Sequence, residues 1–356
     1  MTDETEDLQV EDIDFKPLIA LVASGQTLTE RDAERAFDII MTGNATPAQI
    51  GAFLMGLRVR GETVDEITAA ARVLRSKAVS VQAPEDAIDV VGTGGDGVGT
   101  YNISTAASIV AAAAGARVAK HGNRAASSRS GSADVLGELG LNLDAPPEVF
   151  LRCMEETGIG FMFAQRYHGA MKHVGPMRYE LGVRTIFNLL GPLANPVAAT
   201  FELMGIYSEQ WLEPIAETLG RLGLKRAWVV HGSDGLDEIT TTGPTHVAEF
   251  HQGTVRRFQI VPEDAGLPRA SLEDLKGDDA AFNARAIRDL FAGVRSPYRD
   301  VVLLNAAAAI VITGLEDTLR DGVGRAAAAI DSGRAGQVLD LLVRLSNEPP
   351  PAGEAP

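Results

Sequence analysis

The spacing of apolar positions is helical over residues 15–80 and then changes. Thr46 and Gln49 have the spacing of a capping box, in which each end of the pair satisfies a free backbone N–H at a helix start. Thr63 and Glu66 repeat this spacing. The predicted helices are 30–41, one that begins at Pro47 and stops at Gly61, and one that begins after Thr63. A row of helices without strands indicates a small all-helical domain.

Beyond residue 84, short apolar runs alternate with helical segments, which predicts a mostly parallel sheet flanked by helices. Two further strand-like runs, 246–250 and 255–260, lie close together and favour an antiparallel edge. From about 280 to 345 the pattern is helical again. The expected parallel strands are 88–91, 117–119, 159–163, 201–207 and 227–231.

These patterns divide the chain into four parts. The predicted parts are an acidic disordered tail (1–14), the helical domain (15–83), an α/β domain (84–346) and a second disordered tail (347–356). Helices from about 171 to 190 are expected to pack onto the helical domain, and Asn188, Gly191 and Pro192 are expected to shape the packing between domains.

The charge balance narrows the possible partners. A formal net charge of −16 argues against broad binding to nucleic acid or to an anionic membrane, because both are polyanions. The single cysteine, Cys153, excludes an intrachain disulfide and fits a reducing compartment. No signal-peptide pattern begins the chain, and the apolar run 301–313 is too short to span a bilayer. We therefore expect a cytoplasmic location.

A glycine-rich segment follows the first predicted strand. Its sequence is GTGGDGVGTYNIST (92–105), and an alanine-rich helix comes next. Glycines let a backbone approach a ligand closely, and the free N–H groups at a helix start favour an anion. The segment lacks the Gly-Lys-Ser/Thr of a nucleotide-binding P-loop and fits the dinucleotide fingerprint poorly. An anion-binding loop is the favoured interpretation, and a plain surface turn is the alternative.

A second segment, KHGNRAASSRSGSAD (120–134), follows the second predicted strand. Residues 97–133 carry four cationic side chains and no acid, which reverses the charge of the whole chain locally. Cations, hydroxyls and amides suit phosphate oxygens. Because open α/β sheets bind ligands at the carboxyl ends of their strands, the two loops are expected to share one site. A solvated loop is the alternative.

These two segments resemble the signature loops of the anthranilate phosphoribosyltransferase family. The runs MKHVGPMRYELGVRTIFNLLGPLANP (171–196) and VVHGSDGLDEIT (229–240) are similar to the family's remaining motifs, in the expected order. The resemblance covers roughly residues 15–345. It implies a nucleoside-phosphorylase/phosphoribosyltransferase type of fold.

The resemblance also implies the substrates and the residues that hold them. Phosphoribosyl diphosphate is expected on two loops, and Lys120, Asn123 and Arg178 are expected to support catalysis electrostatically. Anthranilate is expected against Gly92, His121, Asn123, His168 and Arg178. The implied donor-binding residues are Gly92, Gly95, Asp96, Thr100, Asn102, Ile103, Ser104, Thr105, Lys120, His121, Gly122, Asn123, Arg124, Ala125, Ala126, Ser127, Ser128 and Ser132.

Magnesium is the implied cofactor, with two ions per monomer. Ser104, Asp237 and Glu238 are its implied ligands. Two adjacent acids in a loop can reach one hard cation, although such a pair is more often a surface turn. The family also implies a homodimer formed through the helical domain.

The implied reaction transfers the phosphoribosyl group to the amine of anthranilate, releases diphosphate and belongs to tryptophan biosynthesis. Two alternatives stay open. One is an enzyme similar to pyrimidine nucleoside phosphorylases, which share the layout of a helical and an α/β domain. The other is a non-enzymatic relative that binds nucleic acid, for which the net charge of −16 is unfavourable.

Overall fold

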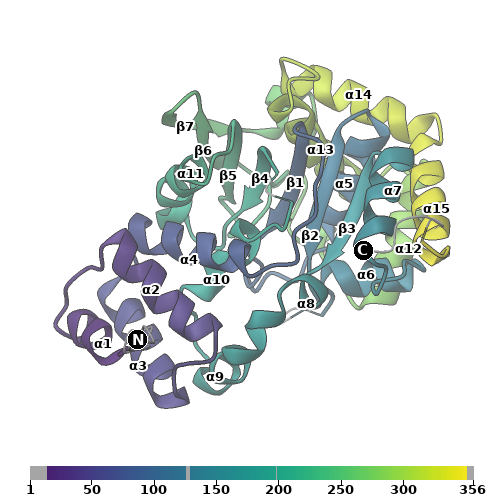
Figure 1. Ribbon diagram of the computed structural model, residues 1–356. Helices are drawn as coiled ribbons and strands as arrows, with labels where there is room; N and C mark the ends of the chain where they lie inside the picture. Colours follow the sequence, from purple (N-terminus) through teal and green to yellow (C-terminus); the bar gives the residue numbers. More distant parts are fainter. Residues whose placement is uncertain (1–13, 126–128, 198, 351–356) are drawn as a thin grey trace, which may run out of the picture.

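A computed structural model describes residues 14–125, 129–197 and 199–350. Figure 1 shows a group of N-terminal helices beside a larger part in which helices surround a central sheet. Within the described ranges, no helix is both long and apolar enough to cross a membrane. The tails predicted at 1–14 and 347–356 lie mainly outside these ranges, although α15 extends to Asn347.

The N-terminal helices follow the start and stop signals of the sequence. Both predicted capping boxes are present, at Thr46 with Gln49 and at Thr63 with Glu66. The prediction missed the first helix, which has eight residues and no side-chain cap. The helices are α1 (Lys16–Ala23), α2 (Glu30–Met41), α3 (Pro47–Arg60) and α4 (Val64–Ser76).

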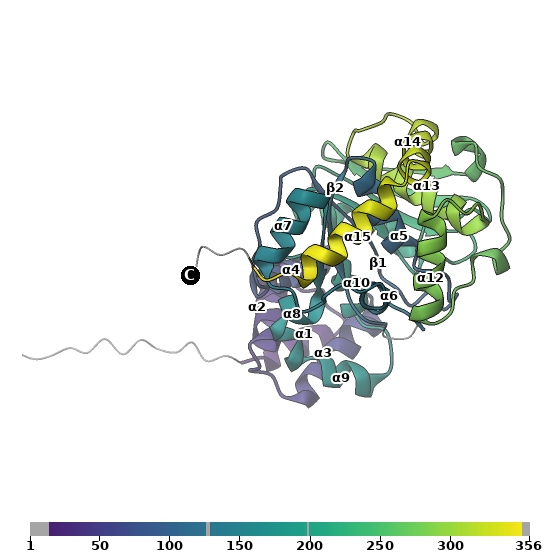
Figure 2. The ribbon, with the colours of Figure 1, turned by 90° about the vertical axis from the view of Figure 1, so that its right-hand side faces the viewer.

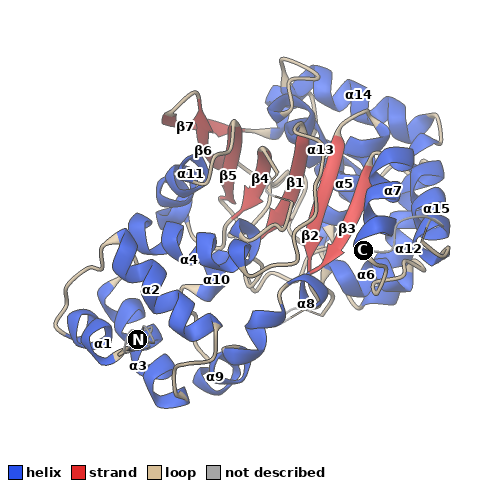
Figure 3. Ribbon diagram, viewed as in Figure 1, coloured by secondary structure: helices blue, strands red, loops and turns tan. Residues whose placement is uncertain are grey.

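The larger part contains a seven-stranded sheet in the order β3-β2-β1-β4-β5-β6-β7 (Figure 3). The first five strands in this order are parallel, and β6 and β7 add the antiparallel edge that the sequence predicted. The strands are β1 (Ala87–Gly92), β2 (Arg117–Gly122), β3 (Ile159–Phe163), β4 (Phe201–Gly205), β5 (Arg226–Gly232), β6 (Thr245–His251) and β7 (Thr254–Ile260).

Helices connect the parallel strands and cover the sheet. Among them, α15 crosses the outside of α5 and α7 (Figure 2). The helices are α5 (Ile103–Ala113), α6 (Ser132–Glu138), α7 (Pro147–Thr157), α8 (Ala164–Tyr167), α9 (Gly175–Leu181), α10 (Phe187–Leu193), α11 (Leu212–Arg221), α12 (Ala280–Phe291), α13 (Pro297–Ile312), α14 (Leu319–Asp331) and α15 (Arg334–Asn347), together with the 3₁₀ helix η1 (Gly169–His173).

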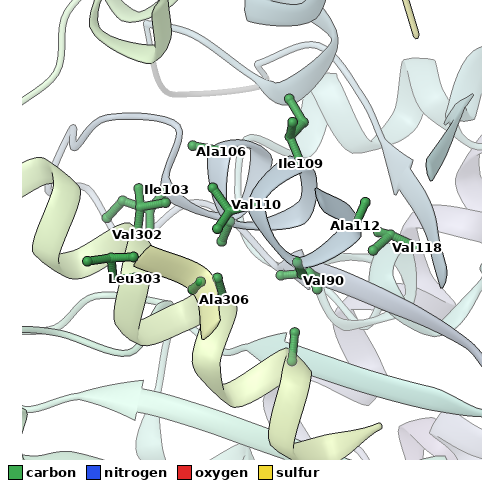
Figure 4. Close-up of a cluster of buried hydrophobic side chains, with 14 of the residues drawn as sticks. Val90, Ile103, Ala106, Ile109, Val110, Ala112, Val118, Val302, Leu303 and Ala306 are labelled. Carbon is green, nitrogen blue, oxygen red and sulfur yellow. The ribbon is translucent and has the colours of Figure 1, made fainter. Parts of the chain in front are cut away.

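Alternate strand residues point to opposite faces, and each face carries its own hydrophobic core. On β5, Trp228 and Val230 join the core that α5 and α13 complete, to which Val110 of α5 and Val302 of α13 both belong (Figure 4). Of the apolar run at 301–313, residues 301–312 lie in α13 and are buried, and Thr313 is the C-cap of that helix.

The other face joins the helical domain to the sheet. Ala227 and Val229 of β5 belong to the same buried cluster as Phe37 of α2 and Phe187 of α10. The rings of Phe37 and Phe187 lie edge to face with centroids 6.0 Å apart. The segment around 171–190 therefore contacts the helical domain and the sheet together.

Candidate active site

The carboxyl ends of β1 and β2 open into a cavity of about 370 Å³. Both predicted ligand loops line it, together with the loop after β5 and helices α9 and α10. Every implied donor-binding residue that the structure describes is part of the lining, and Ala126, Ser127 and Ser128 lie outside the described residues. These described residues are Gly92, Gly95, Asp96, Thr100, Asn102, Ile103, Ser104, Thr105, Lys120, His121, Gly122, Asn123, Arg124, Ala125 and Ser132.

The first loop runs from β1 to the start of α5. Gly94, Gly95, Gly97 and Gly99 all have positive φ, a conformation that other residues rarely adopt. The loop is supported from behind by the segment after the sheet, since Gly277 N–H donates to the Gly99 carbonyl at 3.0 Å. The N-cap side chain of α5 makes no capping hydrogen bond; instead the Ile103 N–H donates to the Tyr101 carbonyl at 2.8 Å and the Ser104 N–H donates to Glu238 at 3.1 Å.

The second loop is tied to the start of α6 by one carboxylate. Asp134 accepts hydrogen bonds from the backbone N–H groups of Ala125 and Gly131, both at 2.9 Å, and from the Arg124 guanidinium at 3.0 Å. These contacts and the Arg124 cation lower the pKa of Asp134 against the opposing effect of burial. Asp134 thereby fixes the loop without occupying the cavity.

Asn102 joins the two loops. Its amide donates to the Ser130 carbonyl at 3.1 Å, and its side-chain oxygen accepts from Ser130 Oγ at 3.0 Å and from Asn283 at 2.9 Å. The resemblance implied that Asn102 contacts the donor. In the structure its side chain is engaged between the loops.

Two acids stand at the inner wall of the cavity. Asp237 is buried and accepts from the Gly94 N–H at 2.6 Å, whereas Glu238 is partly accessible and accepts from the Ser104 N–H at 3.1 Å. Burial, with the charges of Glu238 and Asp96, raises the pKa of Asp237 well above its ordinary value. Burial also raises the pKa of Glu238 to about 7, although Lys120 opposes this. Both shifts mean that a nearby cation would stabilise the ionised pair.

These acids suit magnesium better than a metal that needs many protein ligands. Within the described ranges no three His, Cys, Asp or Glu side chains converge on one point. Magnesium binds through one or two carboxylates and fills its remaining positions with water and phosphate oxygens. The implied ligands Ser104, Asp237 and Glu238 lie together and fit that requirement.

Lys120 lies at the floor of the cavity. It is 2% exposed, and its ammonium donates to the Val90 carbonyl at 2.6 Å. Burial lowers its pKa, and the charges of Asp89 and Glu238 oppose that shift. Lys120 therefore supplies positive charge from beneath the loops.

Arg178 of α9 faces the cavity from the opposite side. Its guanidinium lies 5.4 Å from the ring centroid of Phe187. No carboxylate of the described residues is within ion-pair distance of it, and burial lowers its pKa. An unneutralised guanidinium beside an aromatic ring can bind an aromatic carboxylate.

The two implied histidines occupy different places. His121 is part of the cavity lining, whereas His168 is buried behind it, with ring centroids 5.1 Å apart. Burial lowers the pKa of His121 to about 3 and that of His168 to about 4. Both rings are neutral at neutral pH.

Sequence reasoning missed several residues of the lining. Phe187, Asn188, Gly191 and Pro192 of α10 face the cavity, although the last three were expected only to shape packing. Their apolar or amide side chains offer no charge signal in the sequence. Tyr101, Arg129, Ser130 and Asp278 also line the cavity and were not assigned.

Comparison with known families matches both parts of the chain. Residues 84–336 match the α/β domain of a glycosyl transferase family, and residues 16–78 match the helical bundle domain of that family. Anthranilate phosphoribosyltransferase of Rhodospirillum rubrum is 66% identical over 336 residues, which are 94% of this chain and 97% of the relative. The chain belongs to the anthranilate phosphoribosyltransferase family.

Solved structures agree with this assignment. The Thermus thermophilus enzyme of this name is 44% identical, with a TM-score of 0.88 over 93% of this chain and 99% of that one. A Saccharomyces cerevisiae enzyme in complex with PRPP and Mg is 27% identical, with a TM-score of 0.85 over 94% and 99%. The yeast enzyme was also solved with 4-fluoroanthranilate, at 26% identity and a TM-score of 0.84 over the same shares.

Proposed function

We propose that this chain transfers the phosphoribosyl group of phosphoribosyl diphosphate to the amine of anthranilate, a step of tryptophan biosynthesis. One observation carries the proposal: a single cavity is lined by the glycine-rich loop, the basic loop, the acids Asp237 and Glu238, and Arg178, which has no ion pair among the described residues. The relatives' names favour this transfer over nucleoside phosphorolysis or nucleic-acid binding.

The donor would lie between the two loops. Backbone N–H groups of the glycine-rich loop can receive its diphosphate, while the second loop adds cations and hydroxyls. The yeast relative binds PRPP and Mg, which supports the same pairing here.

Asp237, Glu238 and Ser104 would hold magnesium, and we propose two ions per monomer. Bound magnesium neutralises charge that develops on the departing diphosphate. The raised pKa values of both acids support this role, because two ionised carboxylates without a cation beside them are unfavourable.

Anthranilate would lie between Arg178 and the second loop. The guanidinium can pair with the carboxylate in two parallel hydrogen bonds, and Phe187, whose ring lies beneath that guanidinium, lines the same cavity. Gly92, Asn123 and neutral His121 bound the same space, with His168 supporting His121 from behind. The yeast complex with 4-fluoroanthranilate supports a site for this acceptor.

The chemistry would be a displacement at the anomeric carbon. The carbon–oxygen bond to diphosphate breaks, a carbon–nitrogen bond forms, and the amine passes a proton to anthranilate's own carboxylate or to water. An aromatic amine is unprotonated at neutral pH, so it needs no strong base. The main requirement is stabilisation of leaving-group charge, which preorganised N–H donors and cations provide.

A fluorescence assay tests the proposal directly. Purified protein with magnesium and phosphoribosyl diphosphate should consume anthranilate, seen as decay of its fluorescence, and release one diphosphate for each anthranilate. Phosphorolysis of a pyrimidine nucleoside without diphosphate release, or a gel shift at physiological salt, would support an alternative instead.

Arg178→Ala tests the acceptor site. We expect the KM for anthranilate to rise roughly tenfold to a hundredfold, about the 1.5–3 kcal/mol of a charge-assisted hydrogen bond, with a smaller change in the KM for the donor. Arg31→Ala, at an exposed position of α2, is the matched control. Wild-type constants for anthranilate in the Arg178 variant would refute this placement.

The expected homodimer remains a proposal. Val59 of α3 and Tyr179 of α9 are 81% and 90% exposed on two helices that contact each other. Apolar exposure of this kind supports an interface on the helical domain. Light scattering should give the mass of a dimer, and Val59→Glu should shift it toward the monomer. A monomeric mass for the unsubstituted chain would contradict the proposal.

A further inference from the structure

The backbone register between the two strands that carry the ligand loops stops short of the cavity. The register between β1 and β2 covers two residue pairs, whereas β1 with β4 and β2 with β3 each cover five. The β1–β2 register ends at Ile88 and Val118, although both strands continue for four more residues. The backbone N–H and C=O groups beyond the end of this register need other hydrogen-bond partners, because they are buried.

Side chains provide those partners. Asp89 of β1 accepts a hydrogen bond from the His121 N–H of β2 at 3.2 Å. Asn195, from the turn after α10, donates to the other Asp89 oxygen at 2.7 Å and to the Ala119 carbonyl at 2.9 Å. Asp89 is fully buried and Asn195 is 1% exposed.

Lys120 completes the connection from the opposite strand, because its ammonium donates to the Val90 carbonyl of β1 at 2.6 Å. Three backbone groups beyond the end of the register, those of Val90, Ala119 and His121, are thus bonded to side chains. The last residues of the two strands, Gly92 and Gly122, line the cavity.

We infer that Asp89 and Asn195 are positioning residues which fix where the two donor-binding loops lie relative to each other. They replace part of the backbone ladder with side-chain bridges, so the ends of β1 and β2 stay tied together just before each strand enters its loop. The inference rests on the proposed function for the identity of the ligand.

Asp89→Asn is the sharpest test. An amide has only one acceptor atom, so in either orientation its NH₂ group faces a donor, from His121 or from Asn195. We expect calorimetry with magnesium and phosphoribosyl diphosphate to show at least tenfold weaker binding, together with a lower kcat/KM. Asn195→Ala, which removes the bridge from the other side, should act in the same direction.

Glu202→Gln is the matched control. Glu202 is 1% exposed and lies beside Asp89 in the β1–β4 register, yet the described structure gives it no hydrogen bond to β2. It should bind the donor within about twofold of the unsubstituted chain. If Asp89 only supported folding, Asp89→Asn would lower the melting temperature and leave the donor's dissociation constant for the folded protein unchanged. Wild-type affinity in Asp89→Asn therefore overturns the inference.

Amide hydrogen exchange in the unsubstituted chain tests the inference even if neither variant folds. In the unsubstituted chain the amide of His121 should exchange as slowly as that of Val118, which bonds to Gly158 at 2.7 Å. Fast exchange at His121 would overturn the inference without any substitution. Failure of the unsubstituted chain to bind the donor would instead refute the proposed function.

Discussion

Two pairs of acids lie near the same cavity and have opposite surroundings. Asp237 and Glu238 accept hydrogen bonds from backbone N–H groups on one side and face the cavity on the other. Asp89 and Glu202 lie side by side within the sheet, below the cavity, with Arg75 as a nearby cation.

The comparison shows that burial alone does not mark a metal site. Burial raises the pKa of Asp89 to about 6 and that of Glu202 well above its ordinary value, much as it does for the cavity pair. The difference lies in access: the cavity pair can receive an ion and phosphate oxygens, whereas the sheet pair is closed. We therefore expect substitutions of Asp237 or Glu238 to lower turnover. Substitutions of Asp89 or Glu202 should change mainly the stability of the protein or the position of the loops.

The largest expected effect is loss of turnover when Asp237→Asn and Glu238→Gln are combined. Without both carboxylates the diphosphate loses its cation partner, and turnover should fall roughly 1000-fold or more at ordinary magnesium concentrations. Initial rates from anthranilate fluorescence measure this, with the melting temperature as a check on folding. Full activity would remove both residues from the metal site.

Gly205→Ala should displace the cavity pair without changing its chemistry. A methyl group there would lie 1.6 Å from the Asp237 carbonyl oxygen, so the backbone that carries Asp237 must move. We expect a loss of about 1–3 kcal/mol in unfolding free energy, as for other overpacked sites, and a large fall in turnover. Denaturant titration and initial rates measure both.

The matched control is Gly324→Ala in α14, where an added methyl group meets nothing within 4 Å. It should gain about 0.5–1 kcal/mol in unfolding free energy, because alanine is the better helix former. Wild-type turnover in Gly205→Ala would show that the position of Asp237 does not matter.

Arg75→Met tests the surroundings of Asp89 and Glu202 through its effect on the free energy of unfolding. Arg75 donates to the Leu193 carbonyl at 2.7 Å and its charge favours ionised Asp89 and Glu202. Its removal leaves a buried carbonyl and the acids without that partner, so we expect a loss of about 1.5–3 kcal/mol in unfolding free energy. Turnover per folded molecule should change little. A large fall in turnover with unchanged stability would place Arg75 in the chemistry.

The smallest expected effect is that of Glu202→Gln, and it depends on pH. Folded Glu202 keeps its proton above its ordinary pKa of 4.5, mainly because burial disfavours the charge, while the unfolded chain releases it. The stability that the protonated acid contributes is present below pH 4.5 and is lost as the pH rises, by up to about 1.4 kcal/mol per unit. The side chain of Glu202→Gln does not titrate, so the variant lacks this pH-dependent contribution to the free energy of unfolding.

The stability of Glu202→Gln relative to the unsubstituted chain should therefore increase between pH 5 and pH 7, as thermal or denaturant unfolding can measure. A constant difference across that range would show that Glu202 is ionised in the folded protein.

The sequence by itself determined the local features. Capping pairs predicted the starts of α3 and α4, and short apolar runs predicted all seven strands, because these signals act over a few residues. Glycines and cations after two strands indicated the ligand loops for the same reason. α1 was missed because it has neither a capping side chain nor much length.

Only the tertiary structure decided how distant residues meet. Nothing near Asp89 in the sequence indicates that Asn195, more than a hundred positions later, supplies its partner, or that Lys120 turns toward Val90. Likewise the wall formed by α10 depends on a helix that packs between two domains. Hydrogen-bond partners and burial are set by the packing of elements against one another, and the sequence pattern of a single element does not contain that information.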